Sequence, residues 1–212
     1  IMPKKDNLNV NTTMEVSGKL TDLMESIVKK NGILDVMILI GMGEDVNAKD
    51  NEGKTALMHA ALNTFESDVA EELIKSGASV NTKDYKGKTA FMHAMAVGNK
   101  NVAELLVEKG ADVNCADNEG LTALMYAALN GYGSELVEAL IKYGVDVNIK
   151  DSKGRSAFLV AMLIGNKKVF KLLIENGSNL NMHDNKGQTA LMHVAWDGNE
   201  SEMAEILIAN GA

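Results

Sequence analysis

Apolar and polar positions along the chain repeat with a period of 33 or 34 residues. In each period a polar turn leads into an apolar block, as in the segment DNEGKTALMHAAL. The five copies begin at Asp50, Asp84, Asp117, Asp151 and Asp184. A second apolar block follows in each copy and ends at a glycine, and a shorter copy comes first, with Leu39 and Ile40 before Gly43. Two short helices cannot bury their apolar faces alone, so the period predicts stacked units that share one elongated core.

Each unit is expected to fold as turn, helix, turn, helix. A glycine stands where a tight turn requires a positive φ, at Gly53, Gly87, Gly120, Gly154 and Gly187. A hydroxyl residue that can cap the next helix follows two positions later, at Thr55, Thr89, Thr122, Ser156 and Thr189. The glycine after the second block suits a left-handed C-cap. These signals mark where both helices of each unit begin or end.

The pattern D-x-x-G-x-T-A-L-M-H-A-A followed by L-[IV]-x-x-G-x-x-[VL]-N resembles the ankyrin repeat. The resemblance implies an all-α repeat solenoid of stacked helix-turn-helix units with projecting β-turn or hairpin loops. It covers residues 21–212, after a polar segment 1–20 that is either disordered or a decayed earlier repeat. The expected units are a partial or capping repeat and five repeats, at 21–49, 50–83, 84–116, 117–150, 151–183 and 184–212.

The sequence departs from the family motif T-P-L-H at two positions. Alanine replaces proline, and methionine or leucine replaces histidine, while His59, His93 and His193 lie one position later. We therefore expect the usual hydrogen bond between histidine and turn to be lost. An apolar ladder of Met58, Met92 and their equivalents is expected in its place.

Composition narrows the possible functions. The single cysteine, Cys115, cannot form an internal disulfide, which favours a reducing compartment such as the cytoplasm. No apolar run approaches the roughly 18–20 residues needed to span a bilayer, so no membrane partner is expected. The formal charge of −8 repels phosphate backbones and argues against nucleic acid as a partner.

Motifs for catalysis or for cofactors are not found. There is no phosphate-binding glycine loop and no G-x-S-x-G segment, so the chain is not expected to be an enzyme or to carry a cofactor. His59 and His93 lie one repeat apart, hence about 10 Å apart, which is too far for shared zinc coordination. No metal site is predicted.

The family resemblance implies a groove lined by the first helices and the projecting turns. We expect a protein partner of unknown identity to bind there, so the chain is interpreted as a non-enzymatic interaction module or adaptor. Turn charges alternate in sign beside a partly apolar, partly aromatic strip, and aromatic residues and arginine often anchor interfaces. The candidate partner-binding residues are His59, Leu62, Tyr85, Lys86, Lys88, His93, Val97, Glu119, Leu121, Tyr126, Leu129, Lys153, Arg155, Ile164, His193 and Trp196.

Two other hypotheses stay open. The array could be a structural or regulatory segment of a larger protein, where it would position another domain. Alternatively, a chain that is otherwise monomeric could associate with itself through its C-terminal edge. There the last helix, from Met203 to Ile208, keeps apolar residues much like an internal copy and includes Leu207.

Overall fold

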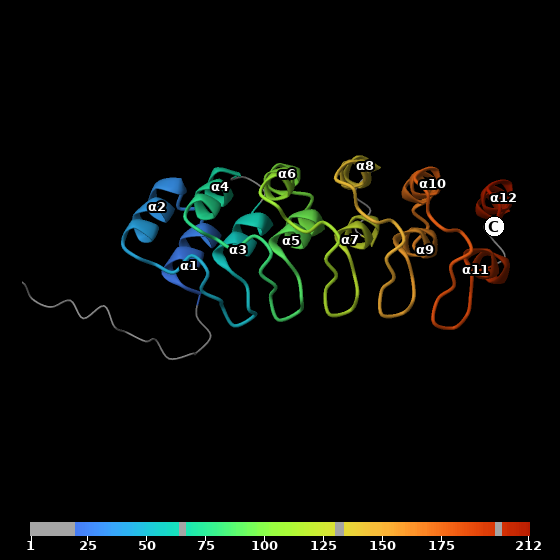
Figure 1. Cartoon of the computed structure of the whole chain (residues 1–212), viewed down its shortest axis with the longest axis horizontal. Helices are drawn as coiled ribbons and strands as arrows, with labels where there is room; N and C mark the ends of the chain where they lie inside the picture. Colours follow the sequence, from blue (N-terminus) through green and yellow to red (C-terminus); the bar gives the residue numbers. More distant parts are fainter. Residues whose placement is uncertain (1–19, 64–66, 130–133, 198–200) are drawn as a thin grey trace, which may run out of the picture.

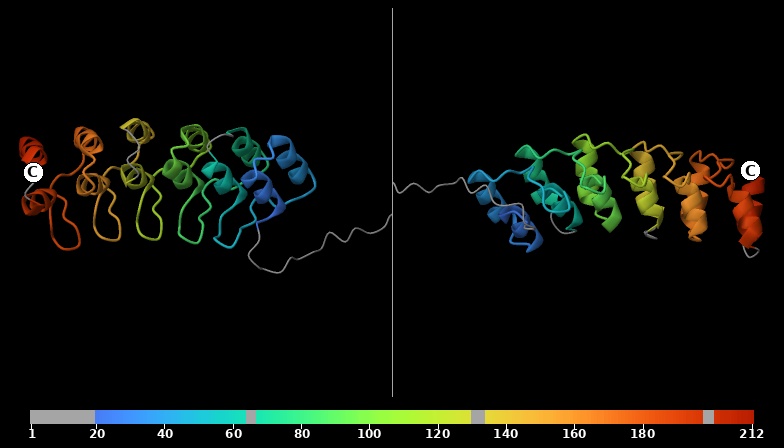
Figure 2. Two further views of the ribbon diagram at one scale, coloured as in Figure 1. Left: turned by 180° about the vertical axis from the view of Figure 1, so that it is seen from behind. Right: turned by 90° about the horizontal axis from the view of Figure 1, so that it is seen from below.

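The computed structural model describes residues 20–63, 67–129, 134–197 and 201–212, and within them the chain forms helix pairs stacked in one direction. Figure 1 shows the helices in two rows, with a finger-like loop projecting beside the lower row in successive layers. The views from behind and from below show that both rows run through the whole array (Figure 2). The expected all-α repeat solenoid is confirmed. The predicted segment 1–20 lies, apart from Leu20, outside the described residues.

We call the helices beside the fingers the inner helices and those of the other row the outer helices. The inner helices are α1 (Asp22–Val28), α3 (Ala56–Leu62), α5 (Ala90–Val97), α7 (Ala123–Leu129), α9 (Ala157–Leu163) and α11 (Ala190–Asp197). The outer helices are α2 (Ile33–Gly41), α4 (Ser67–Lys75), α6 (Lys100–Glu108), α8 (Ser134–Lys142), α10 (Lys167–Glu175) and α12 (Ser201–Ala209). One inner and one outer helix form a layer, so the N-terminal copy, expected to be partial, also contributes a helix pair.

The inner helices are buried along most of their surface, except α11, where only Ala190 and Val194 are buried among the described side chains. They are rich in alanine, the best helix former, whose small side chain lets neighbouring layers approach closely. The expected ladder is buried at Met58, Met92, Met125 and Leu159, which are at most 3% exposed, but not at Met192, which is 55% exposed. The outer helices are amphipathic: Val169, for example, is buried on α10. Small inner residues and one-sided outer helices therefore produce thin layers that share a continuous core.

The turns before the inner helices have the predicted geometry. Gly87 has a φ of +81°, and a Cβ there would lie 2.7 Å from the backbone nitrogen of Asn118, so both conformation and space require glycine. The predicted caps form at three positions, where the hydroxyl oxygens of Thr89, Thr122 and Thr189 accept N–H bonds from the helix. The caps predicted at Thr55 and Ser156 are wrong, because neither hydroxyl makes a capping hydrogen bond.

Asparagine side chains tie successive layers together. Asn81 donates from Nδ2 to the Gly110 carbonyl over 3.0 Å and accepts the N–H of Asp112 over 2.9 Å. Asn47 and Asn148 bridge their own next layers in the same two-bond manner. Each amide binds the carbonyl of the glycine that follows the outer helix of the next layer. Layer spacing therefore has a polar component in addition to apolar stacking.

The two ends of the stack expose apolar residues that have buried or polar counterparts elsewhere. Leu34 and Ile38 on α2 are 67% and 51% exposed, and Met42 at its C-cap is 74% exposed. At the other end, Met192 on α11 and Ile208 on α12 are 55% and 62% exposed. Leu207, which the sequence placed at an apolar C-terminal edge, is fully buried. That expectation is corrected to Met192 and Ile208, because the Leu207 side chain is part of the hydrophobic core.

Candidate functional site

The aspartate that opens each repeat organises its finger. In the third layer, the Asp84 oxygen Oδ1 accepts the backbone N–H groups of Lys86 and Lys88 over 2.9 and 2.8 Å. The same pair of bonds, to the second and fourth residues after the aspartate, recurs in every repeat from 50 onward. One carboxylate oxygen thus fixes the turn and leaves the other oxygen free to meet the inner helix.

The second oxygen, Oδ2, binds a polar side chain near the start of the inner helix. His59, His93 and His193 contact Oδ2 of Asp50, Asp84 and Asp184 at 2.8, 2.9 and 3.1 Å. The expectation that the histidine–turn hydrogen bond is lost is therefore wrong. A histidine one position later in the motif still reaches the turn, because it binds the aspartate side chain.

Two repeats use other residues for the same contact. Tyr126 donates its hydroxyl to Asp117 Oδ2 over 2.5 Å. In the fifth layer Val160 occupies the equivalent helix position, and Arg155 from the finger donates Nε and Nη2 to Asp151 Oδ2 over 2.8 and 2.6 Å. Four fingers are therefore bonded to their own inner helix through the aspartate, whereas in the fifth layer the contact lies within the finger.

These anchors shift several pKa values. Burial lowers the pKa of His93, against the opposing effect of its hydrogen bond to Asp84. Burial pushes the pKa of Asp50 upward, but the hydrogen bonds from His59 and from backbone N–H groups outweigh it and leave that pKa lowered. Burial and the bond to Asp117 raise the pKa of Tyr126 far above its usual range. Asp50 is therefore held as a carboxylate, and Tyr126 is held as a neutral donor.

Backbone hydrogen bonds join the fingers into one row. The N–H groups of Tyr85, Asn118, Ser152 and Asn185 each donate to a carbonyl in the preceding finger over 2.8 to 3.0 Å. The tips therefore form a fixed surface and not a set of independent loops. We call the surface formed by these fingers and the inner helices the groove.

Several fingertip charges expected to face a partner are compensated within the protein. Lys54 pairs with Glu52, Arg155 with Asp151, and the Lys88 ammonium lies 4.3 Å from the centroid of the Tyr126 ring. The lysines at the third position of the turn differ: for Lys86, Lys153 and Lys186 no ion pair is found within the described parts of the chain. The charge available to a partner is thus smaller than the sequence suggests.

Exposed apolar residues follow the ends of the inner helices. Leu129, Leu163, Ile164 and Trp196 are 38%, 45%, 45% and 87% exposed, and Tyr85 on a finger is 65% exposed. Isolated exposed apolar residues are common in proteins, but this set shares one face of one array. Of the strip predicted from the sequence, Leu129, Leu163, Ile164 and Trp196 are therefore exposed, whereas Leu62 and Val97 are half-buried.

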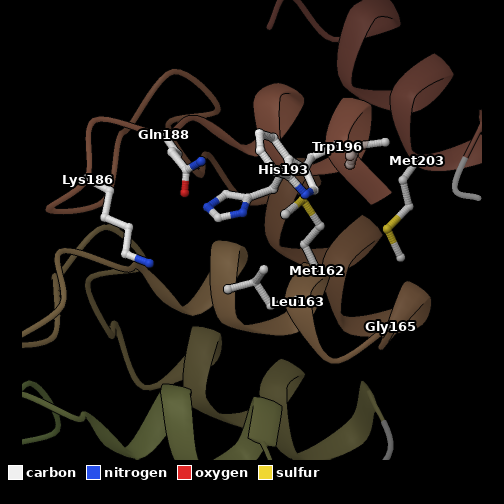
Figure 3. A pocket seen from close by; sticks show the side chains of 9 residues that line it. Met162, Leu163, Gly165, Lys186, Gln188, His193, Trp196 and Met203 are labelled. Carbon is white, nitrogen blue, oxygen red and sulfur yellow. The ribbon is translucent and has the colours of Figure 1, made fainter. Parts of the chain in front are cut away.

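Two hollows lie along the groove. The larger, of about 390 Å³, lies between the last two layers and includes Leu163, His193 and Trp196 in its lining. Figure 3 shows Lys186 and Gln188 reaching it from the finger, with Met203 on the opposite side. The other, of about 320 Å³, lies near the first layers and includes Val28, His59 and Leu62.

The structure divides the candidate residues by accessibility. Those with exposed side chains are Tyr85, Lys86, Glu119, Leu129, Lys153, Ile164 and Trp196. The half-buried ones are His59, Leu62, Lys88, Val97, Leu121, Tyr126, Arg155 and His193. His93 is only 6% exposed and bound to Asp84, so its expected role as a partner contact is corrected to that of an internal anchor.

Sequence reasoning missed the aspartate–helix contact, although the repeats contain a signal for it. The ninth residue after the aspartate is histidine or tyrosine in four repeats, and it is Val160 in the fifth layer. That layer also carries arginine, Arg155, at the fourth position after the aspartate, where the other repeats have lysine, leucine or glutamine. The fifth layer lacks a polar residue at the ninth position and has arginine at the fourth. This exchange indicates that either position can supply the side chain that binds the aspartate.

A search of the described residues for metal sites found no group of three or more histidine, cysteine or acidic side chains able to hold an ion. Cys115 is half-buried, and burial together with its contact to Asp112 raises the pKa of its thiol, which disfavours the reactive thiolate. Among the described helices, none is long and apolar enough to cross a membrane.

The fold and the groove together define a helical repeat array with a row of projecting fingers along one side. The family model for ankyrin repeats, which spans three copies, matches residues 6–84, 23–117, 66–151 and 124–212. The chain belongs to the ankyrin repeat family. Ankyrin repeats are in general non-enzymatic protein–protein interaction modules. A search of curated proteins gave no match.

Proposed function

We propose that this protein is an adaptor that binds a protein partner through the groove. The carrying observation is the exposed strip of Tyr85, Leu129, Ile164 and Trp196 beside a row of fingers held rigid by backbone hydrogen bonds. A fixed surface loses little conformational entropy on binding, and exposed aromatic and aliphatic anchors are the usual source of interface energy. The array offers such anchors over four layers.

Affinity capture from a lysate of the source cells tests the proposal. The bait is compared with a groove variant carrying Tyr85→Ala, Leu129→Ala and Trp196→Ala, which are exposed positions and should leave the fold intact. His93→Ala is unsuitable because it removes an internal anchor. A matched control carries alanine at exposed outer-helix positions, Lys75, Glu138 and Lys168. Circular dichroism checks that all baits are folded.

Loss of one defined protein by the groove variant, with retention by the control, would support the proposal. Retention by both would place binding elsewhere and contradict it. If no protein is retained by any bait, the alternative hypothesis of a structural or regulatory segment in a larger protein would become the better one. Light scattering of Ile208→Glu beside the wild type would test self-association through the C-terminal edge.

A further inference from the structure

The hollow between the last two layers differs in composition from the rest of the groove. Met162, Leu163, Trp196 and Met203 form an apolar wall, and Lys186 stands at the rim. Methionine side chains adapt to the shape of an occupant and make favourable contacts with aromatic rings. Trp196 adds a ring face of its own. Such a wall suits one bulky apolar side chain better than a polar group.

The size of the hollow limits what can enter. Its volume of about 390 Å³ is near the lower end of the range found for ligand pockets, roughly 300–1,000 Å³. That space admits a single large side chain and excludes a packed helix. The occupant is therefore a single side chain of a partner segment and not the segment itself.

At the third position of the fingers, the side chains of the two layers that form the hollow are both positively charged. The third positions of the fingers read Glu52, Lys86, Glu119, Lys153 and Lys186, so alternation ends at the last two layers. Neither Lys153 nor Lys186 has an ion pair among the described residues. The nearby carboxylates are occupied, since Asp184 binds His193 and Asp151 binds Arg155. The two adjacent lysines thus present positive charge that the protein itself does not neutralise there.

We propose, on the basis of the protein-binding role proposed above, that this end of the groove recognises a short linear segment of a partner. The segment carries a bulky apolar side chain, which fills the hollow against Trp196. Within about three residues of it lies an aspartate or glutamate, which pairs with Lys153 or Lys186. An extended chain advances about 3.3–3.6 Å per residue, so this spacing lets one segment reach both hollow and finger.

A random 12-residue peptide library displayed on phage provides the probe. Selection on the whole chain is expected to enrich sequences that combine a phenylalanine, leucine or methionine with an acidic residue one to three positions away. Synthetic peptides from the selection, chosen without tryptophan, are then titrated. Trp196 is the only tryptophan, so its fluorescence should change on binding and report occupancy of the hollow directly.

Substitutions on both sides separate the two contacts. Replacing the apolar anchor of the peptide by alanine should weaken binding at least about tenfold. Lys186→Glu should weaken it by about fivefold, and less at high salt, because the pair is exposed. The matched control Lys168→Glu makes the same charge change on an outer helix and should have no effect. A peptide with lysine in place of its acid should bind Lys186→Glu better than the wild type.

Several outcomes would overturn the proposal. The first is a selection that yields no binding peptides, or peptides without the pairing of an acidic and an apolar residue. The second is Trp196 fluorescence that does not change on binding. The third is an equal effect of Lys186→Glu and Lys168→Glu on affinity. If the selected peptides lose binding in Tyr85→Ala or Leu129→Ala but not in Trp196→Ala, the site lies elsewhere in the groove. That result would be consistent with the adaptor role but would contradict a peptide site at the hollow beside Trp196. If a captured partner ignores all groove variants, the adaptor role itself fails.

Discussion

The third and fourth layers in the middle of the stack and the sixth layer at its C-terminal end are built from nearly the same motif, yet they differ in packing. Met125 in the motif is fully buried, whereas Met192 at the same position is 55% exposed. His93 and His193 make the same contact with an aspartate, but their side chains are 8% and 21% exposed. The bond that ties Asn181 to Gly211 is 3.4 Å long, while its counterpart from Asn81 to Gly110 is 3.0 Å.

The comparison teaches that position in the stack determines what a motif residue contributes. A middle layer has neighbours on both sides, and its motif residues become part of the core. The last described layer has a neighbour on one side only, so the same residue types remain accessible. The hollow beside Trp196 lies where this looser layer meets the fifth one. Stability should therefore concentrate in the middle, and the candidate binding site lies near the end.

The largest difference is expected for methionine truncation. Met125→Ala removes a fully buried side chain and leaves a cavity, which should lower the free energy of unfolding by about 2–5 kcal/mol. Met192→Ala should cost less than about 1 kcal/mol because its side chain is largely in solvent. Chemical denaturation of both variants measures the contrast, and equal losses would contradict it.

The next largest effect is expected at the aspartate anchors. Asp84→Ala leaves His93 and the N–H groups of Lys86 and Lys88 without their acceptor, which should cost about 1–3 kcal/mol. Asp184→Ala should cost less, since water can reach the groups that it leaves behind. Asp84→Asn controls for charge, because its carbonyl oxygen can keep part of the turn. A larger loss of unfolding free energy in Asp184→Ala than in Asp84→Ala would contradict the expected difference between the middle layers and the last layer.

A smaller effect is expected for the asparagine bridges. Asn81→Ala removes two hydrogen bonds between layers, one of them to Gly110, and should cost about 1 kcal/mol. Asn181→Ala should cost less because its bond to Gly211 is long. Thermal unfolding of the two variants side by side provides the measurement. If Asn181→Ala were the more damaging change, the last layer would be tied more firmly than its geometry indicates.

The smallest effect is expected from pH. Burial lowers the pKa of His93, which is flanked by Asp84, Lys54 and Lys88, so the unfolded chain binds a proton more readily than the folded one. The free energy of unfolding should therefore be highest above the unfolded pKa of about 6.5, and it should decrease as the pH falls below that value. His93→Gln should reduce this fall between pH 7.5 and 5.5, measured by urea unfolding. If His93→Gln left the pH dependence of the unfolding free energy unchanged, a group other than His93 would be responsible for it.

The sequence by itself determined the architecture of the array. The 33- or 34-residue period, the turn glycines and the paired apolar blocks predicted layers of two helices with a projecting finger, because these signals are local and repeat in register. It also predicted the apolar strip, from residues at equivalent positions such as Leu129 and Trp196. Local patterns suffice where each residue's role depends mainly on its own turn or helix.

Only the tertiary structure decided which of those residues are accessible and what they bind. Arg155 replaces a helix histidine because its side chain can reach Asp151 from the finger, a route that spacing along the chain does not reveal. Met125 and Met192 occupy the same motif position and differ because only one of them has a layer on each side. The hollow beside Trp196 likewise arises between residues some 34 positions apart. Contacts between layers depend on how neighbouring layers pack, which no single repeat encodes.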